Sequence, residues 1–556
     1  MSDIAIALRG VSFTYADAAT PALRDVNLTV RRGELVTIMG ATGAGKTTLA
    51  KCLNRTIPAF QAGVLQGEIE ILGRTLSGER VADLAGVVGL VSQDFEAQLF
   101  ATNVLQEITF AMEHLGVPLA DMRRRIPEAL AAVGLTGFEH RDPATLSGGE
   151  KQRLAIAATL ALRPPIFVFD EPTTDLDPLG KSEIFAVLAR LRRDGYTMML
   201  VEHEIAAAEH ADRVVLLANG GIAAIGPPAE ILPQVGLLKR HAVRPADLDC
   251  VVADLKLAPT ARTLDAVAAA LPNDDISLPI VTSRPNVADA PLLHADGVTY
   301  AYENDRRAVD NVSLRVDAGE SIALIGQNGS GKTTLAKLLN GLLPPSGGQV
   351  RLGAEPIASM SLDRIAAEVG YVFQNPDQQI FAATVADEVA FGPRNLGLSP
   401  GEIDERVAES LHAVGLSGCE SADPFLLGKG QRQCLAVASL LALRPRALIL
   451  DEPTTGLDYP EQCQMMELVS RLHRDGMTLI IITHSPWVVA EYARRGVLLA
   501  QGRVLFDGPL RELFAHEDLL ERCHFRVPDV TRLGLRLGFT PLSVAEFTAV
   551  YARRGR

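Results

Sequence analysis

Two stretches of the chain carry the same residues at the same spacing. Gly40-Ala-Thr-Gly-Ala-Gly45-Lys46-Thr47 recurs as Gly326-Gln-Asn-Gly-Ser-Gly331-Lys332-Thr333, and both fit G-x-x-x-x-G-K-[ST], the phosphate-binding P-loop. In such a loop, backbone N–H groups and a helix N-terminus surround the phosphates, while the lysine reaches the β- and γ-phosphates. The sequence therefore predicts that the chain binds a nucleoside triphosphate twice. The predicted contacts are Gly40, Gly43, Gly45, Lys46, Thr47 and Thr48, and Gly326, Gly329, Gly331, Lys332, Thr333 and Thr334.

Carboxylates follow a second apolar run in each half of the chain. The run at 166–169 ends in Asp170-Glu171, and the run at 448–450 ends in Asp451-Glu452. An aspartate at the end of a buried strand is placed to hold Mg²⁺ together with the P-loop threonine hydroxyl, and the following glutamate can act as general base on a water. We predict Asp170 and Asp451 as metal ligands, with Thr47 and Thr333, and Glu171 and Glu452 as catalytic bases.

These loops need strands before them and helices after them. Each P-loop follows an apolar run, Leu35–Met39 or Ser321–Ile325, and opens a stretch of helix-like composition. Within each half, apolar β-rich runs alternate with amphipathic stretches, which is typical of a mainly parallel α/β sheet. The fold class predicted is therefore α/β, in two copies.

The two halves keep a nearly constant sequence offset. Lys332 minus Lys46 is 286, whereas Asp451 minus Asp170 is 281. The later landmarks all keep the offset of 281, and the five-residue difference falls in the longer loop at 54–67. Such a repeat predicts a tandem of two homologous domains. We place them at 1–235 and 291–515, with an accessory extension or linker at 236–290, which includes Thr282-Ser-Arg-Pro-Asn, and a C-terminal extension at 516–556.

The composition limits the classes of protein. The chain has 556 residues, a net charge of −14 and six scattered cysteines without a C-x-x-C pair. The acidic balance argues against nucleic-acid binding by bulk electrostatics, and the cysteines give no metal or disulfide framework. The N-terminus lacks the features of a signal peptide, and no window of about 18 apolar residues predicts a membrane span.

A further motif in the first half resembles a known family. Leu146-Ser147-Gly148-Gly149-Glu150 is similar to the LSGGQ signature of ATP-binding-cassette (ABC) ATPases, and Thr173-Thr-Asp-Leu-Asp177 and Thr454-Thr-Gly-Leu-Asp458 resemble the D-loops. The resemblance implies that His203 and His484 are catalytic switch histidines that sense the γ-phosphate. It also implies that Gln93 and Gln374 are Q-loop glutamines that bind ATP and serve as metal ligands. It further implies that Tyr15 and Tyr302 stack on adenine and that Ser147, Gly148 and Gly149 contact ATP.

The same resemblance implies that the cassettes close head to tail, so that each signature completes the ATP site of the other half. One chain then supplies both ATP sites. The second signature departs from the pattern: Gly428 replaces the serine, Lys429 replaces the first glycine, and Gly430 remains. The amides of Gly428 and Gly430 are still expected to contact ATP, while Lys429 either adds charge or points to solvent. We expect the site of Lys332 and Glu452, which receives the intact signature, to hydrolyse ATP faster.

The segment after the second glutamine narrows the class. Gln374-Asn-Pro-Asp-Gln-Gln-Ile-Phe381, with its continuation to Gly397, resembles the ATPases of energy-coupling-factor (ECF) importers of vitamins, cobalt or nickel; the first half carries a looser version from Gln93. The resemblance implies a transmembrane coupling protein and a small substrate-binding membrane protein as partners, no nucleic acid, and a peripheral position on the cytoplasmic face of the inner membrane. We expect an apolar groove with acidic neighbours to receive a basic helix. Its residues are Ile380, Phe381, Val385 and Phe391, with Asp377, Asp387 and Glu388.

Two alternatives stay open. A soluble tandem ABC ATPase acting on ribosomes or nucleic acid usually has a long charged linker, whereas residues 236–290 are mildly acidic and contain several prolines. The ATPase of another ABC importer is disfavoured only by the ECF-like segment. The transported substrate cannot be inferred from this chain.

Overall fold

The computed structural model of the protein describes residues 3–174, 176–271, 290–302 and 307–552. These fall into two compact units, Met1–Asp249 and Cys250–Arg556. The predicted linker motif at 282–286 lies outside the described residues. The domain boundaries at 235, 290 and 515 remain predictions.

The main sheet of the first unit has six strands in the order β10-β9-β3-β8-β7-β6. Five strands are parallel and β10 pairs antiparallel with β9. All residues of the central strands are buried, which explains why their sequences are continuous apolar runs rather than alternating ones. The strands are β3 (Leu35–Met39), β6 (Val88–Val91), β7 (Ile166–Asp170), β8 (Thr197–Val201), β9 (Arg213–Ala218) and β10 (Gly221–Gly226).

A second sheet of the first unit is antiparallel. Its order is β2-β1-β4-β5, and burial alternates along β2, so that one face packs on the core and the other faces water. Tyr15 is the last residue of β1 and therefore lies at the end of this sheet. The strands are β1 (Ile4–Tyr15), β2 (Leu23–Arg31), β4 (Gly63–Ile71) and β5 (Arg74–Thr75).

Helices form a separate subdomain between β6 and β7. In the first unit they are α4 (Val104–His114), α5 (Leu119–Ala132) and α6 (Gly148–Ala161), and their apolar faces share one core with Phe167 and Phe169 of β7. Ser147 caps α6, so the signature motif is the N-terminus of a helix that packs on the sheet.

The second unit repeats this architecture. Its main sheet has the order β16-β17-β18-β13-β19-β20 and its antiparallel sheet the order β12-β11-β14-β15. The predicted fold class, two tandem α/β cassettes with a mainly parallel sheet and a helical subdomain, is confirmed. The strands are β11 (Leu293–Ala301), β12 (Arg307–Val316), β13 (Ser321–Ile325), β14 (Gly347–Leu352), β15 (Glu355–Pro356), β16 (Val369–Val372), β17 (Ala447–Asp451), β18 (Thr478–Ile482), β19 (Arg495–Ala500) and β20 (Arg503–Pro509); the subdomain helices are α15 (Val385–Asn395), α16 (Pro400–Ala413) and α17 (Lys429–Leu441).

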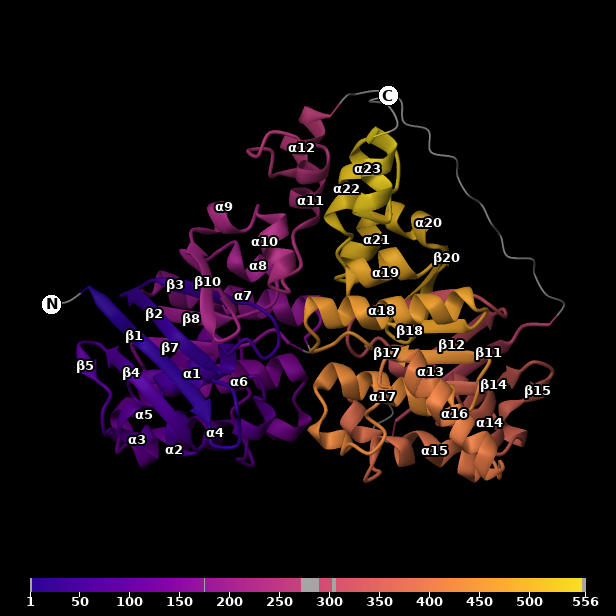
Figure 1. Ribbon diagram of the computed structural model, residues 1–556, viewed down its shortest axis with the longest axis horizontal. Coiled ribbons are helices and arrows are strands. Elements are labelled where there is room, and N and C mark those ends of the chain that lie inside the picture. Colours follow the sequence, from indigo (N-terminus) through magenta and orange to yellow (C-terminus); the bar gives the residue numbers. More distant parts are fainter. Residues whose placement is uncertain (1–2, 175, 272–289, 303–306, 553–556) are drawn as a thin grey trace. The chain divides into compact units, whose positions relative to one another are not determined.

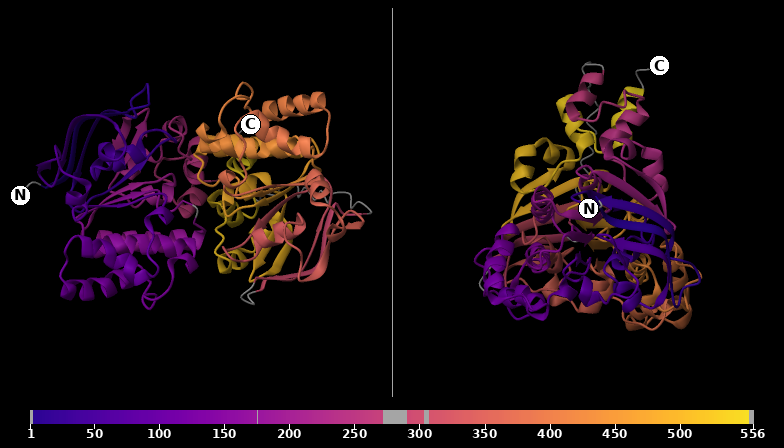
Figure 2. Two further views of the ribbon diagram at one scale, coloured as in Figure 1. Left: turned by 90° about the horizontal axis from the view of Figure 1, so that it is seen from below. Right: turned by 90° about the vertical axis from the view of Figure 1, so that its left-hand side faces the viewer.

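The described parts of the predicted extensions contain several helices. The first contains α10 (Val235–Arg240), α11 (Asp247–Asp254) and α12 (Leu264–Ala270), and the second α21 (Glu517–Arg522), α22 (Asp529–Arg536) and α23 (Val544–Ala552). Within the second unit, α22 and α23 lie at the end away from α15 and α16, as two views show (Figures 1 and 2). Asp265 of α12 forms an ion pair with Arg536 of α22.

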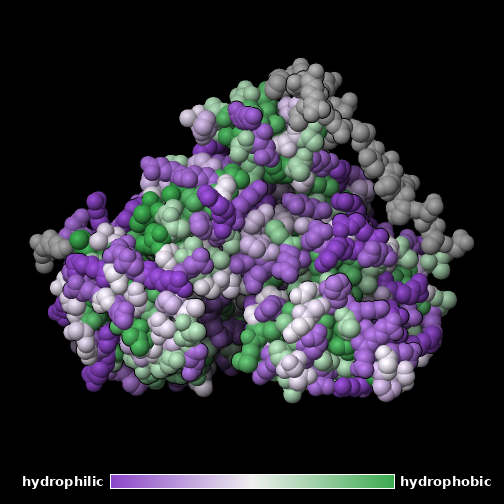
Figure 3. Space-filling view, viewed as in Figure 1, coloured by the Kyte–Doolittle hydropathy of each residue, from purple (hydrophilic) through white to green (hydrophobic). Residues whose placement is uncertain are grey.

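The surface in Figure 3 is largely hydrophilic, with smaller hydrophobic patches between charged residues. In the described part of the chain, no helix combines the length and the apolar character needed to cross a bilayer.

Candidate nucleotide-binding sites

The P-loops turn tightly, and the surrounding backbone leaves no room for a side chain at some of their glycines. Gly40 has φ +145°, and a Cβ there would lie 2.1 Å from the Leu217 carbonyl oxygen; Gly45 has φ +101° and precedes α1 (Lys46–Leu53). Lys46 Nζ donates to the carbonyl oxygens of Gly40 at 3.0 Å and Ala41 at 2.9 Å, so the ammonium group lies over the loop. This is the geometry of an anion-binding loop at a helix N-terminus.

The second P-loop has the same arrangement. Lys332 Nζ donates to the carbonyl oxygens of Gly326 at 2.7 Å and Gln327 at 2.8 Å, and Gly331 precedes α13 (Lys332–Leu339). Both lysines are buried although they are charged, which is costly unless an anion or several acceptors are present.

The predicted metal ligands meet at the end of a strand. Thr47 Oγ1 donates to Asp170 Oδ1 at 3.1 Å, and Thr333 Oγ1 donates to Asp451 Oδ1 at 3.4 Å. Burial raises the pKa of Asp170 to about 6, and the adjacent Glu171 charge adds to the rise. A buried carboxylate beside a hydroxyl is an oxygen-only donor set, which suits Mg²⁺ held jointly with phosphates.

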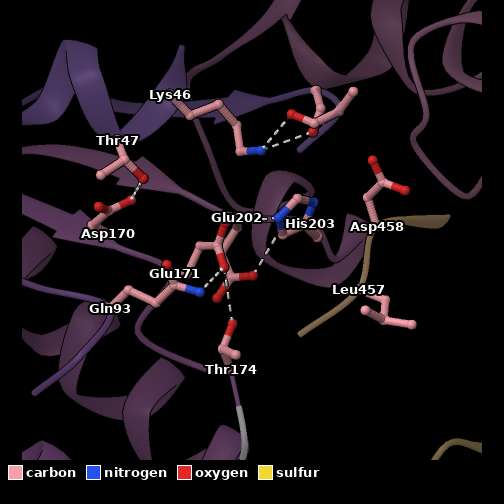
Figure 4. A network of polar contacts seen from close by, with 12 residues as sticks. Lys46, Thr47, Gln93, Asp170, Glu171, Thr174, Glu202, His203, Leu457 and Asp458 are labelled. Carbon is pink, nitrogen blue, oxygen red and sulfur yellow. Dashed lines mark hydrogen bonds and ion pairs between the residues drawn. The ribbon is translucent and has the colours of Figure 1, made fainter. Parts of the chain in front are cut away.

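The first cassette brings its predicted catalytic residues into one network (Figure 4). The Glu171 carboxylate contacts His203 Nε2 at 2.7 Å and accepts hydrogen bonds from Gln93 Nε2 at 2.9 Å and Thr174 Oγ1 at 3.3 Å. Burial favours its neutral form, but the hydrogen bond with His203 and the charges of His203 and Lys46 outweigh burial and lower the Glu171 pKa. The glutamate is therefore ionised at neutral pH, as a general base must be.

The second cassette has a matching pair. Glu452 contacts His484 Nδ1 at 2.8 Å. Burial favours its neutral form, but the charge and hydrogen bond of His484, together with the charge of Lys332, lower the Glu452 pKa. Both glutamates have left-handed backbones, with φ of 51° at Glu171 and 49° at Glu452. Left-handed φ is uncommon for residues other than glycine and costs on the order of 1–3 kcal/mol. Among the described residues, Gln374 makes no hydrogen bond to Glu452 like that of Gln93 to Glu171.

The predicted adenine-stacking tyrosines reach the P-loop helices. Tyr15 OH hydrogen-bonds Thr48 Oγ1 at 2.9 Å, and Tyr302 OH hydrogen-bonds Thr334 Oγ1 at 3.2 Å. The second ring is half exposed, so a face is free to stack on a base. Each tyrosine is thus hydrogen-bonded to the residue that follows the threonine predicted to bind the metal.

The two signatures differ in how they begin their helices. Ser147 Oγ accepts from Glu150 N at 3.3 Å, and the Glu150 carboxylate accepts from Ser147 N at 2.7 Å, which is a capping box. Gly428 offers no side chain; its N–H donates to Gln431 Oε1 at 3.1 Å.

Lys429 lies against the D-loop of its own cassette. A Cβ built at Gly456, which has φ +71°, would lie 2.0 Å from Lys429 Nζ, so the lysine side chain occupies this space. The Lys429 ammonium group therefore lies at Gly456 of the same cassette. Asp175, the equivalent of Gly456 at an offset of 281, lies outside the described residues.

Sequence reasoning missed a buried acid next to the switch histidine. Glu202 accepts hydrogen bonds from Thr173 N at 3.2 Å and His203 N at 3.0 Å, and also from the Thr173 hydroxyl. Burial and the neighbouring Glu204 charge raise the Glu202 pKa to about 7. At the offset of 281 the second cassette has Thr483 in place of this glutamate. A comparison of the two halves could therefore have singled out Glu202.

Glu202→Gln is expected to flatten the pH dependence of stability. Because the folded-state pKa of about 7 exceeds the reference value of 4.5, the folded chain holds a proton that the unfolded chain releases. The contribution of Glu202 is therefore fully favourable below pH 4.5 and is lost as the pH rises through 7, by about 3 kcal/mol. Urea unfolding at pH 5 and pH 8 should show a smaller loss of stability for this variant than for wild type. Exposed Glu209→Gln is the control, and an unchanged loss for Glu202→Gln contradicts the prediction.

The expected helix-binding groove is partly wrong. Ile380 and Val385 are buried in the core of the helical subdomain, so they are unavailable to a partner. Glu388 is 3% exposed and accepts from the N–H groups of Phe381 at 3.0 Å and Ala382 at 2.8 Å. The other two acids are paired, Asp377 with Arg432 and Asp387 with Arg394. Only Phe381 and Phe391 remain as exposed apolar residues of this set.

The two cassettes, each with a P-loop, a strand-end acid pair and a histidine-bound glutamate, define a tandem P-loop ATPase. The family model of the ABC transporter matches residues 23–174 and 309–455. The chain belongs to the ABC transporter ATP-binding proteins, and it is an ATPase with two nucleotide-binding cassettes.

Relatives match along the whole chain. A protein of Caldanaerobacter subterraneus subsp. tengcongensis named as an ABC transporter ATP-binding protein is 43% identical over 567 residues, covering 100% of both chains. A relative from Vibrio vulnificus with the same description is 32% identical and covers 95% of this chain and 93% of its own length. A solved structure described as cbiO1 from Clostridium perfringens, part of the ABC transporter complex cbiONQ, is 32% identical over 44% of this chain and 100% of its own, with a TM-score of 0.39.

Proposed function

We propose that the chain is the ATP-hydrolysing motor of an ECF-type importer for a vitamin or another micronutrient such as cobalt or nickel. The observation that carries the proposal is an exposed aromatic pair in the segment that resembles ECF ATPases, repeated in register in both cassettes. The substrate is recognised by a small membrane protein, and this chain drives a transmembrane coupling protein from the cytoplasmic face of the membrane.

The aromatic pairs have nearly the same geometry. Phe381 and Phe391 meet edge to face with centroids 4.7 Å apart, and Phe100 and Phe110 do so at 4.5 Å. Their exposed fractions are 59% and 46% in the second cassette and 62% and 42% in the first. Exposed aromatic residues are enriched where another protein binds.

A buried carboxylate holds each pair in place. Glu107 accepts from the N–H groups of Phe100 at 2.9 Å and Ala101 at 2.8 Å, as Glu388 does for Phe381 and Ala382. Burying an ionised carboxylate is favourable only when such donors satisfy it. The turn that presents the phenylalanine is therefore fixed rather than loose, and such preorganisation lowers the entropic cost of binding a partner.

Each residue of the nucleotide site has a role in this proposal. The P-loop and Lys46 or Lys332 bind the phosphates of ATP, and Thr47 with Asp170, or Thr333 with Asp451, hold Mg²⁺. An Mg²⁺ ion held by these residues would supply positive charge that offsets the charge of the phosphates. Glu171 or Glu452 orients the attacking water and takes its proton, while the histidine holds the glutamate in place. Gln93 donates a hydrogen bond to Glu171 and begins the segment that carries Phe100. This bond links the nucleotide site of the first cassette to its exposed aromatic pair.

The remaining parts of the proposal follow the family resemblance. The cassettes close head to tail on ATP, and the helical extensions hold them together. A soluble factor acting on ribosomes or nucleic acid, and the ATPase of another importer class, are the alternatives that the experiment below separates.

Phe381→Glu combined with Phe391→Glu is expected to abolish binding of the membrane partner while basal ATPase changes less than twofold. A charge in place of each ring removes an apolar anchor, and hot-spot residues of this kind contribute about 2 kcal/mol or more to binding. The tagged chain is purified from detergent-solubilised membranes of its native host, and the proteins retained are identified by mass spectrometry. Wild type should retain a coupling protein with several membrane spans and a small, very hydrophobic protein.

Leu362→Glu is the matched control, because this residue is an equally exposed apolar side chain of the second unit outside the aromatic pair. The control should retain both membrane proteins. Retention of ribosomal proteins by wild type, or of no membrane protein at all, contradicts the importer proposal. Retention of a transmembrane partner without the small hydrophobic protein favours another importer class.

A further inference from the structure

The metal-binding aspartate of the second cassette has a partner that its counterpart lacks. Tyr371 of β16 is buried, and its hydroxyl donates to Asp451 Oδ2 at 2.7 Å. Thr333 Oγ1 occupies the other carboxylate oxygen, Oδ1, at 3.4 Å. Both oxygens of Asp451 therefore accept a hydrogen bond from a side chain.

The first cassette has Leu90 at the same register, 281 residues earlier. Asp170 Oδ1 accepts from Thr47 Oγ1 at 3.1 Å, as in the second cassette. Among the described residues, no side chain donates to Asp170 Oδ2. The two aspartates thus differ by one hydrogen bond, although their strands and their threonine partners are the same.

The neighbouring parallel strand explains how tyrosine reaches the carboxylate. Tyr371 pairs with Ile449 of β17, two residues before Asp451, and its ring packs edge to face on Phe373 at 5.1 Å. A tyrosine hydroxyl keeps its proton at neutral pH. It therefore acts as the hydrogen-bond donor to Asp451 and stabilises the ionised carboxylate. With Oδ2 held by Tyr371, the oxygen of Asp451 on the side of the Thr333 hydroxyl is Oδ1, which is the oxygen that would face a metal ion beside Thr333.

We propose that Tyr371 is a positioning residue that presets Asp451 for single-oxygen binding of Mg²⁺ with ATP, and that the first cassette lacks this device. The proposal rests on the proposed role of the two aspartates as Mg²⁺ ligands. Mg²⁺ demands near-octahedral geometry and usually takes one oxygen from a carboxylate beside the phosphates. Hydrogen bonds to ligating carboxylates fix their orientation, and their removal typically weakens metal binding by about 10- to 100-fold.

The test compares Tyr371→Phe with wild type in the Lys46→Ala chain, in which only the second P-loop retains its lysine. Mn²⁺ replaces Mg²⁺, and its binding in the presence of a non-hydrolysable ATP analogue is followed by electron paramagnetic resonance. We expect the Kd for Mn²⁺ to rise about tenfold. Binding of the analogue with EDTA present should stay unchanged, because the phenyl ring and its packing are kept.

The reciprocal variant is Leu90→Tyr in the Lys332→Ala chain, where the Kd for Mn²⁺ at the first cassette should fall. An unchanged or lower Kd for Tyr371→Phe overturns the proposal. Equal weakening of analogue binding with and without metal also overturns it, because it indicates a merely structural role. If the Lys46→Ala chain binds no nucleotide at all, the proposed nucleotide site fails instead, which separates the two results. Should Leu90→Tyr fail to fold, Tyr371→Phe alone decides.

Discussion

Replacing Glu452 by Gln is expected to remove about 90% or more of the steady-state ATPase rate, whereas Glu171→Gln leaves most of the rate intact. Each glutamate is the proposed general base of its own cassette, so the difference between the two variants reports how the two sites are completed. If each signature serves the opposite cassette, the Glu452 site receives Ser147, and the Glu171 site receives Gly428. Without the serine hydroxyl, the Glu171 site would lack one hydrogen bond to a charged phosphate. Such a bond contributes about 1.5–3 kcal/mol, which corresponds to roughly ten- to a hundred-fold in rate.

The bases themselves do not account for such a difference. Both have left-handed φ, at 51° and 49°, and both contact their histidine at 2.7–2.8 Å. Glutamine keeps the shape of the side chain, so equilibrium ATP binding by the two variants is the control and should stay close to wild type. A larger loss for Glu171→Gln than for Glu452→Gln would refute the assignment of the faster site.

The sequence predicted those parts of the site that depend on short, local spacing. A P-loop needs glycines with left-handed φ and a following helix, and both requirements are visible within eight residues, as at Gly40–Thr47. The strand before Asp170 is recognisable because a strand buried on both faces must be apolar throughout. The offset of 281 then carries each assignment from one half to the other.

Residues whose role depends on three-dimensional contacts could not be predicted in this way. Glu388 reads as an exposed acid on a helix, yet it is buried because its carboxylate binds two backbone N–H groups of the preceding turn. Ile380 and Val385 are apolar residues of the kind that line a binding groove. Because the helices of the subdomain pack together, both side chains lie in its core instead. Periodicity alone does not distinguish an apolar residue that faces a partner from one that faces its own domain.

Differences between the halves were visible, but their meaning was not. Tyr371 against Leu90 looks like a neutral exchange within a buried strand until its hydroxyl is found 2.7 Å from Asp451. Likewise, Lys429 and Gly456 are separate departures in the sequence, and only the structure shows that the lysine fills the space above the glycine. An internal duplication therefore gives a list of candidate asymmetries, and contacts decide which of them matter.

Gly428→Ser combined with Lys429→Gly is expected to raise the ATPase rate of the Glu452→Gln chain about tenfold or more. In that chain only the Glu171 site turns over, and the double variant gives the second signature the residues of the first. The structure accepts the serine, because a Cβ at position 428 meets only Gln431 Oε1, at 3.6 Å. Removing Lys429 also releases the D-loop at Gly456. Steady-state phosphate release at saturating ATP measures the effect.

The control is the opposite exchange, Ser147→Gly, placed in each of the two base variants. In the Glu171→Gln chain, where only the Glu452 site turns over, it should lower the rate roughly tenfold, because the hydroxyl that completes this site is lost. In the Glu452→Gln chain it should change little, since the remaining site uses the second signature. The reverse pattern would mean that each signature serves its own cassette, in which case the faster site is the one built on Lys46 and Glu171. A loss in both chains would show instead that removing the α6 cap weakens the first cassette as a whole, which a fall in its unfolding temperature would reveal.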